Sequence, residues 1–242
     1  IQSRGNGHYV SFANYDYLGL ADHPDVKAAA HQAVDKFGVG ALASRLVGGE
    51  RSTHQIFEDD LAKFLGVEAT LSLVSGYLTN LTVITHLMAK RDAIFLDELS
   101  HNSVATGART SDAAQIVFRH NDLDHLDELL TEHREKYNNV MIAVESLYSM
   151  DGDTIDLPRL VELKEKHQAW LLVDEAHSIG VIGPDGDQLG IITPDEGRRI
   201  AGELGLDLVE VAPDYDHTGT TAILAAQVLL NFIGRIMHQR SS

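Results

Sequence analysis

The chain has 242 residues, enough for one large domain or two small ones. With 44% hydrophobic and 23% charged residues it has the composition of an ordinary globular protein, which excludes a disordered chain. The formal net charge of −17 excludes a surface that binds nucleic acid or an anionic membrane, because contacts with phosphates need clustered Lys and Arg.

The absence of cysteine excludes disulfides and thiolate metal sites, and it is compatible with a cytoplasmic protein. The longest apolar segment, residues 222–236, is too short and too polar to span a bilayer, so we expect no membrane association. The N-terminus lacks a basic region followed by an apolar stretch and predicts no signal peptide. It begins with Ile1 rather than Met, which indicates a fragment or a processed chain.

Two helices are predicted first. One covers residues 24–37, with Asp22 as its cap and Gly38 as its end. The other has Ser52 or Thr53 as its cap and ends at Gly66.

Strands and helices then alternate along the chain. The predicted strands cover residues 70–74, 93–96, 115–118, 140–145 and 169–174, and the predicted helices cover residues 77–88, 101–109, 122–132 and 157–167. Strands that alternate with helices of about ten residues indicate parallel βαβ units with helices on both faces of the sheet. The predicted fold class is therefore α/β, a three-layer α/β/α arrangement around a mostly parallel sheet.

A turn-rich cluster at residues 183–187 marks a predicted boundary. The same rhythm resumes beyond it, with a helix at 194–204, a strand at 208–211, a loop through His217 and a helix at 220–237. We therefore predict two parts, residues 1–183 and residues 184–242.

Three polar positions follow predicted strands. Ser75, Gly76 and Tyr77 stand between a strand and a helix start, where free backbone N–H groups and the helix dipole favour an anion such as a phosphate. His101 follows the next strand, where an imidazole either stacks on a flat ligand, binds a metal or is a plain surface histidine. Ser149 lies in a turn after a later strand, where its hydroxyl either meets a ligand or caps the loop.

Asp174 is the residue that points most clearly to a kind of site. It closes a hydrophobic strand, where a carboxylate is costly to bury without a partner, and a protonated pyridine nitrogen is such a partner. His177, three residues later, is placed to reach the phenolic oxygen of the same ring or the substrate. Together with the positions above, this pattern points to pyridoxal phosphate (PLP) chemistry, which needs a Schiff-base lysine.

Six segments occur in an order and spacing typical of one family. They are residues 12–20 (FANYDYLGL), 38–49, 75–77 (SGY), 100–103 (SHNS), 149–153 (SMDGD) and 173–183 (VDEAHSIGVIG). The chain thereby resembles the α-oxoamine synthases over about residues 8–183. These are fold-type I PLP-dependent enzymes, related to class I and II aminotransferases, that condense an amino acid with an acyl thioester and in most members release carbon dioxide.

The resemblance implies the large domain of a PLP-dependent transferase and a role for each matched residue. Ser75, Gly76 and Tyr77 would surround the cofactor phosphate, and His101 would stack on the pyridine ring. Asp174 would pair with the ring nitrogen. Contacts to the phenolic oxygen would come from two residues, Ser149 and His177.

The resemblance also implies catalytic roles for His101 and His177, a substrate contact through Asn14 and Tyr15 from a partner subunit, and hence a homodimer. The implied substrates are an amino acid and an acyl thioester carried by coenzyme A or a carrier protein. The implied location is cytoplasmic. We expect no metal.

The chain also departs from the family. The Schiff-base lysine, in a Thr/Ser-rich loop after the strand that ends at Asp174, has no counterpart, because the last lysine is Lys166. The small C-terminal domain of the family, with its carboxylate-binding arginine, is also absent. We therefore expect impaired or absent turnover in a truncated large domain.

The residues beyond the predicted boundary resemble other protein families. Residues 205–236 resemble the last strand, loop and helix of the ureohydrolases (agmatinase and arginase), where the glutamate matching Glu210 lies near the guanidinium of the substrate. Residues 186–213 more weakly resemble the amino-terminal domain of translation initiation factor 3. We expect residues 184–242 to be a foreign α/β end piece that completes the truncated domain.

Two alternatives to a condensing enzyme follow from this tail. One is a non-catalytic structural chimera or designed fusion. The other is a remnant of a manganese ureohydrolase, although the manganese-binding Asp and His motifs of that family do not occur upstream.

Overall fold

The computed structural model describes residues 2–4, 7–11, 14–182 and 208–209. The chain divides into two compact units. Unit 1 comprises Ile1–Leu73 and Gln188–Ser242, and unit 2 comprises Val74–Asp187. The predicted boundary between residues 183 and 184 falls outside the described residues and stays a prediction.

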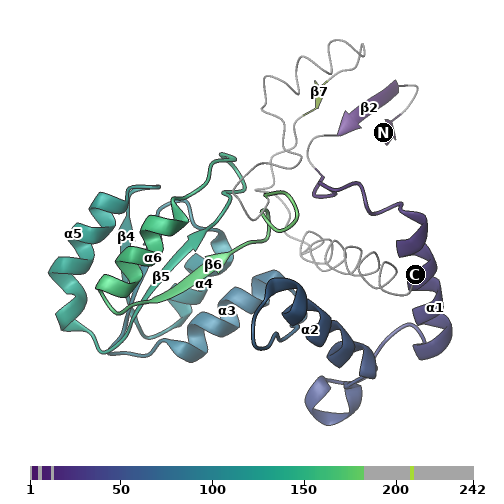
Figure 1. The fold of residues 1–242 in the computed structure, drawn as a ribbon, viewed down its shortest axis with the longest axis horizontal. Coiled ribbons are helices and arrows are strands. Elements are labelled where there is room, and N and C mark those ends of the chain that lie inside the picture. The colour runs from purple at the N-terminus through teal and green to yellow at the C-terminus, as the bar shows by residue number, and fades with distance from the viewer. Residues whose placement is uncertain (1, 5–6, 12–13, 183–207, 210–242) are drawn as a thin grey trace. The chain divides into compact units, whose positions relative to one another are not determined.

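Unit 1 contains two described helices, a π-helical turn and three short strands (Figure 1). They are β1 (Gln2–Arg4), β2 (Gly7–Ser11), α1 (Pro24–Phe37), η1 (Arg45–Gly49), α2 (Ser52–Leu65) and β7 (Leu208–Val209). β2 pairs antiparallel with β1 and parallel with β7. The strand predicted at 208–211 is thus present at its first two residues. Its other two residues, both predicted tail helices and the loop through His217 lie outside the described residues.

Helix α1 has the predicted bounds but a different cap. His23 occupies the cap position, and its Nδ1 accepts a hydrogen bond from the backbone N–H of Asp25 at 3.3 Å. The prediction of Asp22 is wrong because Pro24 is the first helical residue, which places the cap immediately before it. Gly38 ends the helix with φ of 77°, in the region that favours glycine.

Helix α2 begins one residue earlier than a cap at Ser52 implies, and two residues earlier than a cap at Thr53 implies. Ser52 is its first residue, so neither Ser52 nor Thr53 is the cap; Arg51 holds that position, and its backbone N–H donates to His54 Nδ1 at 3.1 Å. Gly66 ends the helix in the left-handed conformation, as predicted.

The predicted strand at residues 70–74 is absent, because Glu58 of α2 takes up its polar groups. The Glu58 carboxylate accepts hydrogen bonds from the backbone N–H of Ser72 at 2.6 Å and from Arg45 at 2.5 Å. The hydroxyl of Thr70 donates to the Glu58 carbonyl at 2.8 Å. Backbone groups paired in this way have no need of a neighbouring strand.

Unit 2 follows the predicted alternation: every strand and α-helix agrees with its prediction to within one residue at each end, and the short 3₁₀ helix η2 was not predicted. Its elements are α3 (Gly76–Leu87), β3 (Ala93–Asp97), α4 (Asn102–Thr110), β4 (Ala114–Phe118), α5 (Leu123–His133), η2 (Arg134–Lys136), β5 (Val140–Glu145), α6 (Leu157–Lys166) and β6 (Trp170–Asp174). The helix starts are fixed by side chains: Ser75 and Asp122, for example, each accept a backbone hydrogen bond at a cap position.

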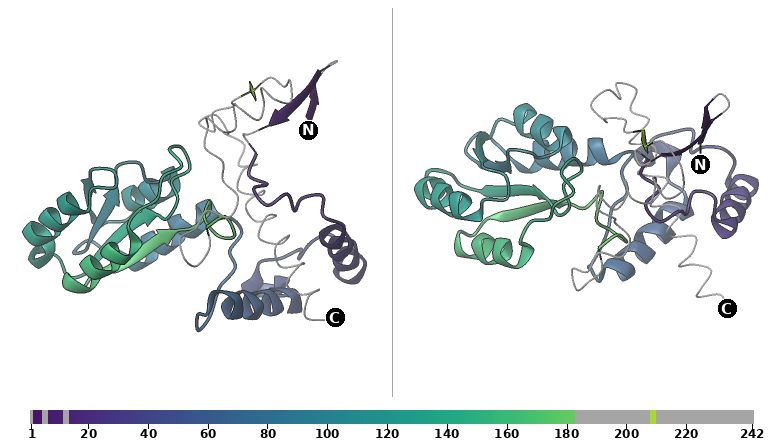
Figure 2. Two further views of the ribbon diagram at one scale, coloured as in Figure 1. Left: turned by 45° about the horizontal axis from the view of Figure 1, so that its top comes forward. Right: turned by 90° about the horizontal axis from the view of Figure 1, so that it is seen from above.

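The sheet of unit 2 has the strand order β4-β3-β5-β6, and all neighbouring strands are parallel. Helices α5 and α6 cover one face, and α3 and α4 cover the other (Figure 1 and Figure 2). The three-layer α/β/α fold and its parallel sheet are therefore confirmed.

The core of unit 2 lies on both faces of the two central strands. On β3, Phe95 packs with the α5 and α6 layer while its neighbour Ile94 packs with the α3 and α4 layer; both are fully buried. Successive side chains of a strand point to opposite faces, so the continuous apolar runs of β3 and β5 fill both layers at once. In the described part of the chain no helix is long and apolar enough to cross a membrane.

The carboxyl ends of the strands gather acidic side chains at one edge of this sheet. β3 ends at Asp97, β5 at Glu145 and β6 at Asp174. The helices run back against the strands, so the N-termini of α3 and α4 reach the same edge. This edge carries most of the residues predicted for the site.

Candidate functional site

Asp174 is held by two donors. Its Oδ2 accepts a hydrogen bond from Asn80 Nδ2 of α3 at 2.7 Å, and its Oδ1 accepts one from the backbone N–H of Ala176 at 3.0 Å. The side chain is half-buried. Two donors fix the carboxylate in one orientation, and its oxygens keep lone pairs for a further partner.

Asn80 extends this contact to His101. Its Nδ2 also lies 2.9 Å from Ser103 Oγ, and Ser103 Oγ lies 2.6 Å from His101 Nδ1. The backbone N–H of Ser103 also donates to His101 Nδ1, so this nitrogen acts as an acceptor. A single chain of hydrogen bonds thus joins Asp174, Asn80, Ser103 and His101.

The sequence patterns missed Asn80 and Ser103. A signal for Asn80 was its position four residues after Gly76, one turn further on the same face of α3. Ser103 lies two residues after His101, at the start of α4, where backbone N–H groups commonly donate to the cap side chain.

The start of α3 offers backbone donors in open space. Ser75 is the cap, and its Oγ accepts from the backbone N–H of Leu78 at 3.2 Å. A Cβ added at Gly76 would meet no atom within 4 Å. Tyr77 lies edge-on to His101, with ring centroids 6.3 Å apart. The structure therefore brings the predicted serine, glycine, tyrosine and histidine to one place.

Glu145 is a buried carboxylate that the sequence patterns also missed. It stands opposite Asp174 in the β5–β6 register and accepts backbone hydrogen bonds from His101 at 2.6 Å and from Ser149 at 3.3 Å. Burial, and secondly the negative charge of Asp174, raise the pKa of Glu145 to about 7. The exposed Ser149 is thereby tied to the same strand end.

We expect Glu145 to make unit 2 less stable as the pH rises. Its pKa is about 7 in the folded protein against an ordinary value of 4.5, so the folded protein binds more protons between these values and stability falls with pH. Urea unfolding at pH 5 and pH 8 is the measurement. Glu145→Gln is expected to reduce the difference in unfolding free energy between the two pH values by about 1–3 kcal/mol. An equal pH dependence in the variant would contradict this assignment.

His177 belongs to the same electrostatic site. Burial lowers its pKa, Asp174 opposes this effect, and His101 adds to it. The turn that carries His177 is fixed by Ser178, whose Oγ lies 2.7 Å from Ser146 Oγ of the loop after β5. A neutral imidazole is the form that accepts a proton.

Asn14 and Tyr15 belong to unit 1. Asn14 Oδ1 accepts from the backbone N–H of Asp16 at 3.1 Å, and the Tyr15 ring lies edge-on to Tyr17 with centroids 6.1 Å apart. Their contact with a substrate stays a prediction.

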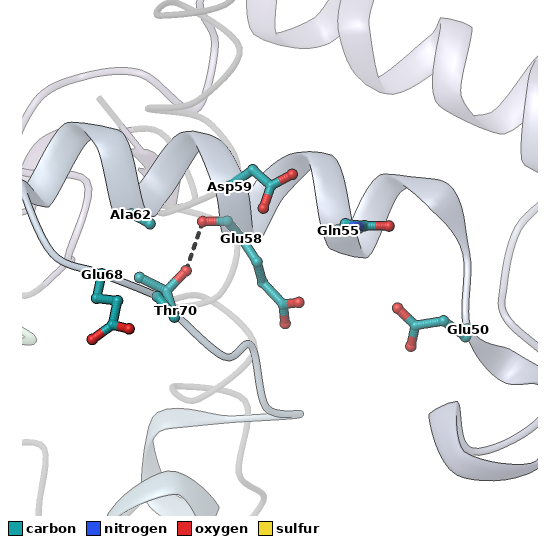
Figure 3. A pocket seen from close by; sticks show the side chains of 8 residues that line it. Glu50, Gln55, Glu58, Asp59, Ala62, Glu68 and Thr70 are labelled. Carbon is teal, nitrogen blue, oxygen red and sulfur yellow. Dashed lines mark hydrogen bonds between the residues drawn. The ribbon is translucent and has the colours of Figure 1, made fainter.

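A pocket of about 320 Å³ lies along α2 in unit 1 (Figure 3). It is lined by Glu50, Gln55, Glu58, Asp59, Ala62, Glu68, Ala69 and Thr70. None of the residues predicted for the site lines it. Its carboxylates would repel a phosphate, so it does not compete with the edge of the unit 2 sheet as a phosphate site.

Comparisons with protein families place most of the chain in one group. The family described as aminotransferase class I and II matches residues 7–206. The arginase family matches residues 193–234, in agreement with the resemblance seen in the tail.

Individual relatives agree with the larger match. An 8-amino-7-oxononanoate synthase from Chromobacterium violaceum is 49% identical over 175 residues, which are 72% of this chain and 45% of the relative. The enzyme of the same name from Geobacter sulfurreducens is 44% identical over 226 residues, 93% of this chain and 56% of the relative. The chain spans about half the length of these curated relatives.

The fold is similar to that of a solved serine palmitoyltransferase from S. paucimobilis, a lysine-to-alanine variant with a bound PLP–myriocin aldimine. The TM-score is 0.73 at 27% identity, covering 95% of this chain and 63% of that one.

Proposed function

Because the chain belongs to the aminotransferase class I and II family, with α-oxoamine synthases among its relatives, we propose that unit 2 is a binding cradle for pyridoxal phosphate. The observation that carries the proposal is the fixed carboxylate of Asp174 at the end of β6, joined through Asn80 to the helix starts at Gly76 and His101. When bound, this cofactor supplies an electron sink for reactions at the α-carbon of an amino acid.

The donors and acceptors fit the charges of the cofactor. Asp174 offers a negative charge to the protonated ring nitrogen. The free backbone N–H groups at the start of α3 suit the phosphate, and the open space at Gly76 lets the phosphate approach them. The exposed ring of His101 is available to stack on the pyridine. Ser149 and His177 are proposed for the phenolic oxygen.

His177 is proposed as the proton acceptor near the substrate. Its lowered pKa keeps the imidazole neutral near pH 7, and the neutral imidazole is the form able to accept a proton. His101 is proposed as the second catalytic residue, because its imidazole would stack on the pyridine ring of the cofactor.

The lysines of unit 2 lie at the wrong edge of the sheet for a covalent bond to this cofactor. Lys90 precedes β3, Lys136 precedes β5, and Lys164 and Lys166 precede β6, all at the amino ends of the strands. A five-residue strand separates the two edges by roughly 16 Å. We therefore propose that unit 2 binds the cofactor without a covalent bond to its own lysines, and that turnover by this chain is impaired.

The test is a PLP titration followed by borohydride reduction and peptide mass mapping. We expect saturable binding by absorbance and no pyridoxyl group on Lys90, Lys136, Lys164 or Lys166. A stoichiometric adduct on any of these lysines would contradict the proposed position of the cofactor. The absence of binding would refute the proposal that unit 2 binds this cofactor.

Gly76→Val is the matched variant for the phosphate contact. Its side chain would enter open space and so would not disturb the protein, but it would collide with a phosphate held by the α3 amides. We expect about a tenfold rise in the dissociation constant. Gly40→Val serves as the control, because Gly40 also faces open space but belongs to unit 1.

For the condensing enzyme that residues 8–183 resemble and from which they would derive, we propose condensation of an amino acid with an acyl thioester of coenzyme A or a carrier protein, in a cytoplasmic homodimer. The similarity to 8-amino-7-oxononanoate synthases supports this reaction class. Asn14 and Tyr15 are proposed to reach the substrate from the partner subunit.

The arginase-family match at residues 193–234 favours one alternative, a tail of ureohydrolase origin. We propose that this tail completes the fold as a foreign end piece and has no hydrolytic role. Stoichiometric manganese in the purified protein would instead favour a ureohydrolase remnant. Cooperative unfolding that PLP does not affect would favour a purely structural chimera.

A further inference from the structure

His120, two residues after the end of β4, joins two carboxylates from different elements. Its Nδ1 lies 2.8 Å from Asp97 Oδ1 at the end of β3, and its Nε2 lies 3.0 Å from Asp153 Oδ2 in the loop after β5. A neutral imidazole has one N–H, so donation to both carboxylates requires the imidazolium. The Asp97 side chain is fully buried, so a positively charged partner offsets the cost of burying its negative charge.

The other groups that face His120 leave this arrangement intact. The Tyr148 ring lies edge-on to the imidazole with centroids 4.5 Å apart, and the Glu98 carboxylate accepts from the backbone N–H of His120 at 2.8 Å. Asn121 donates its backbone N–H to Asp97 at 2.9 Å and its side-chain N–H to Asp153 at 2.7 Å. Every charged side chain in these contacts with His120 is therefore negative.

Asp153 closes the loop that carries Ser149. The backbone N–H of Tyr148 donates to the Asp153 carbonyl at 2.9 Å, and the N–H of Gly152 donates to the Tyr148 carbonyl at 2.9 Å. Gly152 has φ of 72°, which lets the chain turn back on itself. Holding Asp153 therefore holds the whole turn from residue 148 to residue 153.

We propose that His120 is a positioning residue whose imidazolium fastens the 148–153 loop to the end of β3 and thereby fixes Ser149. We call the group His120, Asp97 and Asp153 the histidine clamp. The clamp is a property of the free protein, and only its effect on cofactor binding rests on the proposed function. The clamp implies that the loop carrying Ser149 is held while His120 is protonated and is released when rising pH deprotonates it.

The direction of this pH dependence follows from the charges. Burial lowers the pKa of His120, but the hydrogen bonds and charges of Asp97 and Asp153 outweigh burial, so the pKa is raised above its ordinary value. A raised pKa gives stabilisation that is complete below the unfolded-state pKa of about 6.5 and is lost as the pH rises through the folded-state value.

The experiment is amide hydrogen exchange of the free protein, corrected for intrinsic rates, with PLP binding measured on the same samples. At pH 6 we expect His120→Gln to raise the exchange of the Tyr148 and Gly152 amides about tenfold. His133→Gln, at the end of α5, is the matched control and should leave both amides unchanged. Equal protection in His120→Gln and the unmodified chain would overturn the clamp.

Asp153→Asn keeps the test decisive if His120→Gln does not fold. Asparagine retains an oxygen that accepts from His120 Nε2 but removes one negative charge. The pH at which the loop is released should therefore fall, and NMR titration of the His120 ring measures this change. An unchanged titration would overturn the clamp. Loosened loop amides with unaltered PLP affinity would support the clamp and refute only the Ser149 contact, and a chain that never binds PLP would refute only the proposed function.

Discussion

Asp174→Ala is expected to raise the dissociation constant for pyridoxal phosphate about 10- to 100-fold, because a charge-assisted hydrogen bond contributes about 1.5–3 kcal/mol. The variant removes the only carboxylate that Asn80 holds in place among the described contacts. It also leaves the Asn80 amide with one fewer acceptor, which loosens its link to Ser103. The measurement is a fluorescence or absorbance titration at pH 7.

Glu175→Gln is the control for this variant. Glu175 is the exposed neighbour of Asp174, so its substitution changes the net charge equally without touching the proposed ring contact. We expect the dissociation constant to stay within about twofold of the starting value, because exposed charges interact weakly. If both variants weaken binding alike, the effect is one of net charge and Asp174 has no special role.

Phe95→Ala is expected to lower the unfolding free energy of unit 2 by about 3–5 kcal/mol. Phe95 is fully buried on the central strand β3 and packs in the layer that α5 and α6 cover. Removing its ring leaves a cavity that the flanking strands cannot fill without breaking their register. Such a loss is a large fraction of the stability of an ordinary domain, about 5–15 kcal/mol.

Urea unfolding followed by circular dichroism measures this loss. Val161→Ala is the control, because Val161 is 45% exposed on α6 and alanine is a good helix former. Its expected effect lies within about 0.5 kcal/mol. A comparable loss in both variants would mean that Phe95 is not part of a tightly packed core.

The elements of unit 2 were predictable because each carries its own local signal. The central strands are apolar on both faces, and the helices begin at cap residues such as Ser75 and Asp122. The strand predicted at residues 70–74 failed for the opposite reason. Its backbone is satisfied by Glu58, and no local pattern reveals a partner more than ten residues away.

The site was predictable only in part. Asp174 closes the hydrophobic strand β6, where a polar side chain is conspicuous, and His177 follows three residues later. Asn80 and Glu145 act through partners 94 and 44 residues distant in the chain, Asp174 and His101 respectively. Contacts at such separation depend on the order of strands in the sheet, which local patterns do not contain.

The bond between Asn80 and Asp174 also has a consequence for biosynthesis. The two residues are 94 positions apart, so at ribosomal speed Asp174 emerges on the order of 10 s after Asn80. Late in that interval the helices that carry Asn80 and His101 are complete, while β5 has β3 as a neighbour but still lacks β6. The edge that carries Asp174 is therefore the last part of this sheet to be assembled, and on the proposed role of Asp174 we expect a nascent chain to bind the cofactor only when β6 has docked.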